Sequence, residues 1–326
     1  MRQETIQFKN IKLFRFTFVP YSFCMKSTAI ILLFLVLGLS PCFAADYKIG
    51  HTRIRFIDSS REKRWVPAEV YYPANTQGND VSVAAGLEGK VPVIVFGHGF
   101  VMKWTAYQYL WEALVKQGYL VAFVVTESSF DAKHEDFARD MLFVLHSLEK
   151  AGHQQNSIFY NKLSGTNCIM GHSMGGGAAV LAAAADSTVH CLVTFAAAQT
   201  HPSAVKAAKK IKQPSLFFGG GNDCITPQGK NQIPMYDSLP GNCNMFVSIK
   251  GGSHCYMADK NFACDFGEFT CSPKPGIERR RQHEKILQYL LPWLEAMLLD
   301  HKEKIPEILN MMKTDTTIIC ASNCLR

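Results

Sequence analysis

Several features that define other classes of protein are missing from this 326-residue chain. No two cysteines have the CxxC spacing, which excludes the common structural zinc motifs. The sequence contains no internal repeat and no low-complexity tract, which excludes solenoids and fibrous proteins. The apolar run at residues 29–39 is shorter than the roughly twenty residues that cross a bilayer. Because 48% of the residues are hydrophobic, the composition predicts a single globular domain with a large core.

The net positive charge of the chain is also small once residues 1–44 are left out. The formal net charge is +7, but residues 1–44 carry five Lys or Arg and one Glu, so without them it falls to +3. Such a balance does not indicate a nucleic-acid partner.

Residues 25–44 have the three parts of a secretory signal peptide. Met25 and Lys26 form a positive start, residues 29–39 an apolar centre, and residues 42–44 a cleavage site with small side chains at its first and third positions. We therefore expect a secreted or periplasmic protein without a stable membrane span. The expected organisation is an upstream extension (residues 1–24), a signal peptide (25–44), a folded domain (45–300) and a C-terminal tail (301–326).

Nine of the eleven cysteines follow this signal, and an exported chain is expected to oxidise the exposed ones. Cys168 and Cys191 lie in apolar runs, which favours buried free thiols. A zinc site built from cysteines and His254 is the alternative, although no metal is expected. Two disulfides are predicted from short separations: Cys264 with Cys271, and Cys320 with Cys324.

Apolar runs of strand length alternate with amphipathic segments of helix length. Residues 91–96 and 120–125 are continuous apolar runs, typical of strands buried on both faces of a parallel sheet. Further strands are expected at 49–57, 68–72, 168–170, 191–196, 215–218 and 245–249, and a short helix in the tail. This alternation predicts an α/β fold with a doubly wound, mostly parallel sheet. Residues 197–214 are too few to form a large lid domain.

Residues 171–175 read Gly-His-Ser-Met-Gly, and two more glycines follow. A predicted strand precedes this segment and a run of small residues, typical of a helix, follows it. The arrangement predicts a nucleophile elbow, in which glycines leave room for a sharp turn that carries Ser173. The N-terminus of the following helix favours negative charge near this serine.

Two more strand ends carry a carboxylate and an imidazole. Asp223 follows the predicted strand 215–218, and His254 follows the strand 245–249. The carboxyl ends of parallel strands share one edge of the sheet, so Ser173, Asp223 and His254 are expected to meet there. Imidazole can take the proton of the serine hydroxyl, and the carboxylate can orient the imidazole and stabilise its cation. These three residues are the predicted catalytic triad.

Other residues are assigned supporting roles. The backbone N–H groups of Phe100 and Met174 are the predicted oxyanion hole, and both side chains are expected to contact substrate. Asp131 is the alternative acid. His172 is expected to pack beneath the serine, whereas His98 either orients the oxyanion loop or packs passively.

The elbow, the Asn222-Asp223 turn followed by Pro227, and the Gly-Gly-Ser-His segment ending at His254 resemble bacterial cutinases and poly(ethylene terephthalate) hydrolases. These are dienelactone-hydrolase-like esterases of the α/β-hydrolase superfamily, and the resemblance covers about residues 46–299. It implies the α/β-hydrolase fold and a serine carboxylic-ester hydrolase that forms an acyl-enzyme through the triad named above. It also implies a disulfide between Cys224 and Cys255, which directly follow two triad residues.

The chain departs from these polyester hydrolases at residues 196–199. They place a tryptophan there that clamps an aromatic ring of the substrate, whereas this sequence reads Ala-Ala-Ala-Gln. One alternative is therefore an acetylhydrolase or lipase-like esterase that acts on small or lipid esters but not on polyester. The other is a non-catalytic binding protein with the hydrolase fold. The expected partner is an ester substrate, polymeric or lipid, bound by a monomer without a cofactor.

Overall fold

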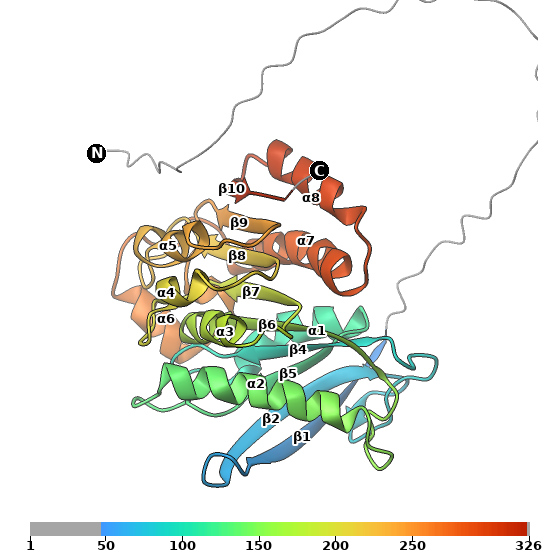
Figure 1. Cartoon of the computed structure of the whole chain (residues 1–326). Coiled ribbons are helices and arrows are strands. Elements are labelled where there is room, and N and C mark those ends of the chain that lie inside the picture. Colours follow the sequence, from blue (N-terminus) through green and yellow to red (C-terminus); the bar gives the residue numbers. More distant parts are fainter. Residues whose placement is uncertain (1–46, 325–326) are drawn as a thin grey trace, which may run out of the picture. The chain divides into compact units, whose positions relative to one another are not determined.

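A computed structural model describes residues 47–324 (Figure 1). The predicted upstream extension and signal peptide lie outside the described residues. Within residues 47–324, none of the helices combines the length and the apolar character needed to cross a bilayer.

The centre of the fold is a ten-stranded sheet with the order β10-β9-β8-β7-β6-β4-β5-β2-β1-β3. Strands β4 to β9 pair in parallel, whereas β2 pairs antiparallel with both β5 and β1, and β10 pairs antiparallel with β9. The strands are β1 Lys48–Asp58, β2 Arg64–Ala74, β3 Gly78–Asn79, β4 Val91–Gly97, β5 Leu120–Val124, β6 Leu163–His172, β7 Cys191–Phe195, β8 Ser215–Gly220, β9 Asn244–Ile249 and β10 Ile318–Ser322. The predicted α/β fold with a mostly parallel sheet is confirmed.

Helices cover both faces of this sheet (Figure 1). One face packs against α2 His134–Ala151, α3 Met174–Ala185, α4 Ala204–Ala208 and α5 Gln232–Asp237; the other packs against α1 Gln108–Lys116, α7 Arg279–Leu298 and α8 Lys304–Thr314. Along β4, Val93 and Val95 belong to the first core, and Ile94 and Phe96 to the second. Both sides of the strand are buried, which explains its uninterrupted apolar sequence.

The connection between β7 and β8 carries only the five-residue helix α4. The expectation that no large lid covers this edge of the sheet is therefore met. An element that the sequence analysis did not predict, helix α6 (Phe262–Phe269), lies instead in the loop after β9. The side chain of Asn261 caps it by accepting the backbone N–H of Cys264 at 3.0 Å.

The C-terminal tail contains the expected helix, α8, and also the unpredicted strand β10. The predicted Cys320–Cys324 disulfide is wrong: Cys320 is a free thiol on β10, and Cys324 is bonded to Cys243. Four residues of nearly extended chain span about 13 Å, too far for a disulfide. Cys324 instead reaches the segment that leads into β9.

Candidate active site

Ser173 occupies a strained turn between β6 and α3. Its φ and ψ are 54° and −119°, a conformation that residues other than glycine seldom adopt. The turn is tight because a Cβ atom on Gly171 would lie 2.2 Å from the carbonyl oxygen of Gly175. A Cβ atom on Gly175 would lie 2.1 Å from the carbonyl oxygen of Gly97. The predicted elbow geometry is therefore present, with glycine required at both positions.

Asp223 and His254 lie in the loops after β8 and β9, and their side chains meet. Nδ1 of His254 lies 2.9 Å from Oδ2 of Asp223, and both residues are buried. Burial raises the pKa of Asp223, but the facing imidazole and the hydrogen bonds to His254 and Thr226 outweigh it, so the pKa is lower than usual. The carboxylate is thus ionised at neutral pH and can hold the imidazole with Nδ1 protonated.

The remaining lone pairs of the Asp223 carboxylate also have partners. Oδ1 accepts the backbone N–H groups of Ile225 and Thr226 at 2.9 and 2.7 Å. The hydroxyl of Thr226 lies 2.8 Å from Oδ2. Thr226 is not among the residues predicted from the sequence, although its position three residues after an aspartate is typical of a turn closed by a side chain.

Ser173 and His254 are neighbours without a direct bond. The imidazole of His254 lies beside that of His172, the residue before Ser173, with ring centroids 4.7 Å apart. In the part of the chain that the structure describes, no hydrogen bond joins the Ser173 hydroxyl to His254. The structure therefore pairs the acid with the imidazole and places that pair next to the elbow.

The two N–H groups predicted as the oxyanion hole come from segments of the chain that pack against each other. A Cβ atom on Gly175 would lie 2.5 Å from the carbonyl oxygen of His98, so the end of β4 packs directly against the start of α3. Met174 is the first residue of α3, where backbone N–H groups have no partner within the helix. The Met174 side chain is buried in the core, whereas that of Phe100 is exposed and contacts Phe130 edge to face.

His172 packs beneath the elbow, as expected. Burial and the nearby imidazole of His254 hold the pKa of His172 well below its usual value, so the ring is neutral at pH 7. Nδ1 of His172 lies 3.0 Å from the hydroxyl of Tyr107, which in turn accepts the backbone N–H of Gly99 at 2.8 Å. This chain of contacts connects the elbow to the loop that carries Phe100.

The other two candidates lie on either side of the site. His98 is buried, with Nδ1 2.8 Å from the carbonyl oxygen of Gly99 and Nε2 2.9 Å from that of Thr126. These contacts fit a role in orienting the loop after β4. Asp131 lies at the surface, where its carboxylate accepts the hydroxyl of Ser129, and it is not the partner of His254.

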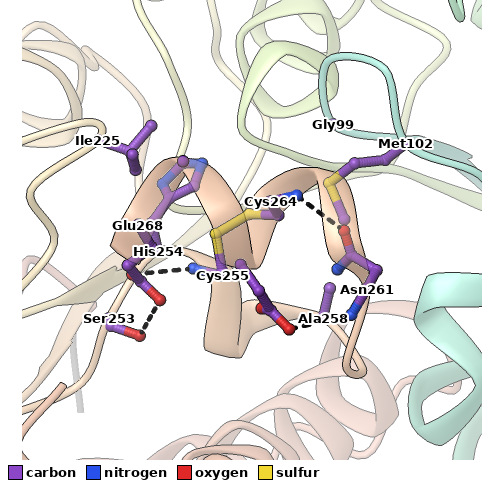
Figure 2. The surroundings of a disulfide bond; sticks show 12 residues. Gly99, Met102, Ile225, Ser253, His254, Cys255, Ala258, Asn261, Cys264 and Glu268 are labelled. Atoms are coloured by element: carbon purple, nitrogen blue, oxygen red, sulfur yellow. Dashed lines mark hydrogen bonds between the residues drawn. A yellow bond between two sulfur atoms is a disulfide. The ribbon is translucent and has the colours of Figure 1, made fainter. Parts of the chain in front are cut away.

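Two disulfides join the segment around α6 to both loops of the acid–imidazole pair, and Figure 2 shows the one between Cys255 and Cys264. Cys255 is bonded to Cys264 within α6, and Cys224 is bonded to Cys271 just beyond its end. The predicted pairs Cys224–Cys255 and Cys264–Cys271 are therefore wrong. Seven residues of helix separate two positions by about 10 Å, so Cys264 and Cys271 each reach a different loop.

A buried carboxylate of α6 adds hydrogen bonds to the loop that carries His254 (Figure 2). Glu268 accepts the Ser253 hydroxyl at 3.1 Å and the backbone N–H of Cys255 at 3.2 Å, on either side of His254. Gln282 of α7 bonds both the N–H and the carbonyl of Ser253, at 2.9 and 2.8 Å. Within residues 47–324, no group of three or more His, Cys, Asp or Glu side chains could hold a metal ion.

Comparison with known proteins agrees with this architecture. The sequence matches the PET hydrolase-like family over residues 48–272. It is also 24% identical over 186 residues to a bis(hydroxyethyl) terephthalate hydrolase of Streptomyces coelicolor, covering 57% of this chain and 54% of that protein. The chain thus spans about half the length of this curated relative. The match over most of the sheet shows that this chain belongs to the PET hydrolase-like family of α/β-hydrolases.

Proposed function

We propose that this protein is a serine carboxylic-ester hydrolase whose triad is Ser173, His254 and Asp223. The observation that carries the proposal is the buried contact of 2.9 Å between His254 and Asp223, beside a strained serine elbow. Family membership supports the same chemistry.

In the proposed reaction, His254 takes the proton of Ser173 while the serine oxygen attacks the ester carbonyl. The N–H groups of Phe100 and Met174 stabilise the resulting oxyanion, at about 3 kcal/mol each. His254 then gives its proton to the departing alcohol, leaving an acyl group on Ser173. Water, activated by His254, releases the carboxylic acid and restores the enzyme.

We further propose that the substrate is a hydrophobic ester, of which the relative's bis(hydroxyethyl) terephthalate is one candidate. Phe100 and Phe130 form an exposed aromatic pair beside the proposed oxyanion hole, and α6 adds three exposed phenylalanines at 262, 266 and 269. The absence of tryptophan at residues 196–199 favours the second candidate, small aliphatic or lipid esters.

Export as a monomer to the periplasm or the medium completes the proposal. Three disulfides join described residues, which suits an oxidising compartment.

The test is turnover by the purified mature chain, with the Ser173→Ala protein as blank. We expect hydrolysis of p-nitrophenyl butyrate that is lost in the blank, and parallel assays with bis(hydroxyethyl) terephthalate, a long-chain triglyceride and amorphous polyester film distinguish the candidate substrates. If neither protein hydrolyses any of these esters, or both do so equally, the proposal is wrong. Binding of these esters without hydrolysis would favour a non-catalytic hydrolase-fold protein.

A further inference from the structure

A buried threonine hydroxyl contacts both members of the acid–imidazole pair. Oγ1 of Thr226 lies 2.8 Å from Oδ2 of Asp223 and 2.9 Å from Nδ1 of His254. It also lies 3.1 Å from the carbonyl oxygen of Ala196 and 3.1 Å from Nε2 of Gln232. Thr226 and Gln232 are both buried, so these contacts are made away from water.

The single proton of this hydroxyl can be assigned from the acceptors around it. Asp223 Oδ2 is nearer than the carbonyl of Ala196 and carries a negative charge, so the hydroxyl donates to the carboxylate. Nε2 of Gln232 is an amide nitrogen that can only donate hydrogen bonds, so it donates to the oxygen of Thr226. Hydrogen bonds thus run from Gln232 through Thr226 to Asp223, which also accepts the N–H of His254.

We propose that Thr226 is a positioning residue that turns the Asp223 carboxylate toward His254 and offsets part of its negative charge, thereby setting the pH dependence of the reaction. This inference rests on the proposed function. In the absence of the hydroxyl, Oδ2 has one donor fewer and presents more negative charge to the imidazole. Protonated His254 is then favoured up to a higher pH.

Removing the hydroxyl leaves the other hydrogen bonds of Asp223 and Gln232 in place. The backbone N–H of residue 226, not its side chain, holds Asp223 Oδ1. Nε2 of Gln232 still donates hydrogen bonds to the carbonyl oxygens of Ala197 and residue 226, at 2.6 and 3.2 Å. Thr226→Val has nearly the same shape and deletes only the hydroxyl.

The other ionisable groups around His254 stay in place in this variant. They are His172, whose ring faces that of His254, Glu268, which bonds the residues on either side, and Arg279, which donates to the carbonyl of Cys255 at 2.7 Å. None of these three hydrogen-bonds to the side chain of Thr226, so a change in the titration of His254 reports on the hydroxyl.

The experiment compares the wild type with Thr226→Val and Thr226→Ser by two measurements. The first follows the titration of the His254 imidazole by NMR, using histidine labelled at Cε1 and assigned with His254→Ala. The second records kcat and kcat/KM against pH on p-nitrophenyl butyrate. Thr194→Val is the control, because it removes a buried hydroxyl that has no hydrogen-bond partner among residues 47–324.

We expect Thr226→Val to move the NMR midpoint of His254, and the acidic limb of kcat/KM, up by about 0.5 to 1 pH unit, and to lower kcat by roughly three- to tenfold. Thr226→Ser and Thr194→Val should titrate like the wild type. An unchanged His254 titration in Thr226→Val would overturn the inference, as would an equal change in Thr194→Val. The NMR titration needs no turnover. It therefore tests the role of Thr226 independently of the Ser173→Ala assay, which tests the proposed function.

Discussion

Oδ2 of Asp223 lies 2.9 Å from Nδ1 of His254, and the two side chains are buried together at the ends of adjacent strands β8 and β9. A buried carboxylate in this position stabilises the imidazolium that forms when the serine is deprotonated. Asparagine keeps the shape but not the charge, so Asp223→Asn should lower kcat by about 10³-fold or more.

The matched control for this substitution is Asp131→Asn. Asp131 is exposed and bonded to Ser129, so its replacement should leave ester hydrolysis unchanged. Steady-state kinetics on p-nitrophenyl butyrate would show the difference. Equal losses in the two variants would contradict the assignment of Asp223.

The disulfides of α6 lead to a second prediction. Replacing Cys224 and Cys271, or Cys255 and Cys264, by serine should cost about 2–4 kcal/mol of unfolding free energy and also lower kcat, because each pair anchors a loop of the site. The control pair Cys243 and Cys324 joins the segment before β9 to the chain after β10, so its loss should cost stability alone. The comparison requires urea denaturation and kinetics on all three double variants. A loss of kcat as large in the control pair would contradict a specific role for α6.

Crowding at the elbow gives a third prediction. The backbone of Gly175 lies against that of Gly97, so the methyl group of Gly175→Ala has no room. We expect a loss of about 3 kcal/mol or more in unfolding free energy. Gly229→Ala is the control, because a Cβ atom there meets no atom of the described residues within 4 Å. Similar midpoints of urea denaturation for the two variants would show that the elbow is not as tight as described.

The pH dependence of stability gives a fourth prediction. Asp315, between α8 and β10, accepts Lys285 Nζ at 2.7 Å and the Tyr289 hydroxyl at 2.9 Å. Burial raises the pKa of Asp315, but these partners and Thr317 outweigh it, so the pKa is strongly lowered. A carboxylate whose pKa is lower in the folded than in the unfolded state stabilises the fold above pH 4, and this contribution fades as the pH falls further.

Asp315→Asn should therefore cost about 2 kcal/mol at pH 7 and progressively less below pH 4. The exposed Asp300 provides the control, since Asp300→Asn should have little effect at either pH. Urea denaturation at pH 7 and pH 3 measures both variants. A cost that is the same at the two pH values would contradict the ionised role of Asp315.

The features that the sequence predicted correctly depend on local or repeating patterns. The apolar run of β4 reveals a strand buried on both faces, and the small residues around Ser173 reveal the elbow because the turn itself requires them. Asp223 and His254 could be proposed as a pair because parallel strands end at one edge of the sheet.

What was missed depends on the folded arrangement. The correct cysteine partners follow from helix α6, whose position between two loops is not encoded by cysteine spacing. Strand β10 is short and lies at an edge, so its pairing with β9 decides its structure. Thr226 gained its role only when folding brought Gln232 and His254 to the same hydroxyl.

The central claim is that the pair of Asp223 and His254 activates the hydroxyl of Ser173. The most direct measurement is reaction of the purified chain with diisopropyl fluorophosphate, followed by peptide mass spectrometry. The account predicts one adduct, on Ser173, that is lost in Ser173→Ala and forms far more slowly in His254→Ala. Ester hydrolysis that persists with Ser173 unmodified, or labelling of Ser173 at an unchanged rate in His254→Ala, would contradict it.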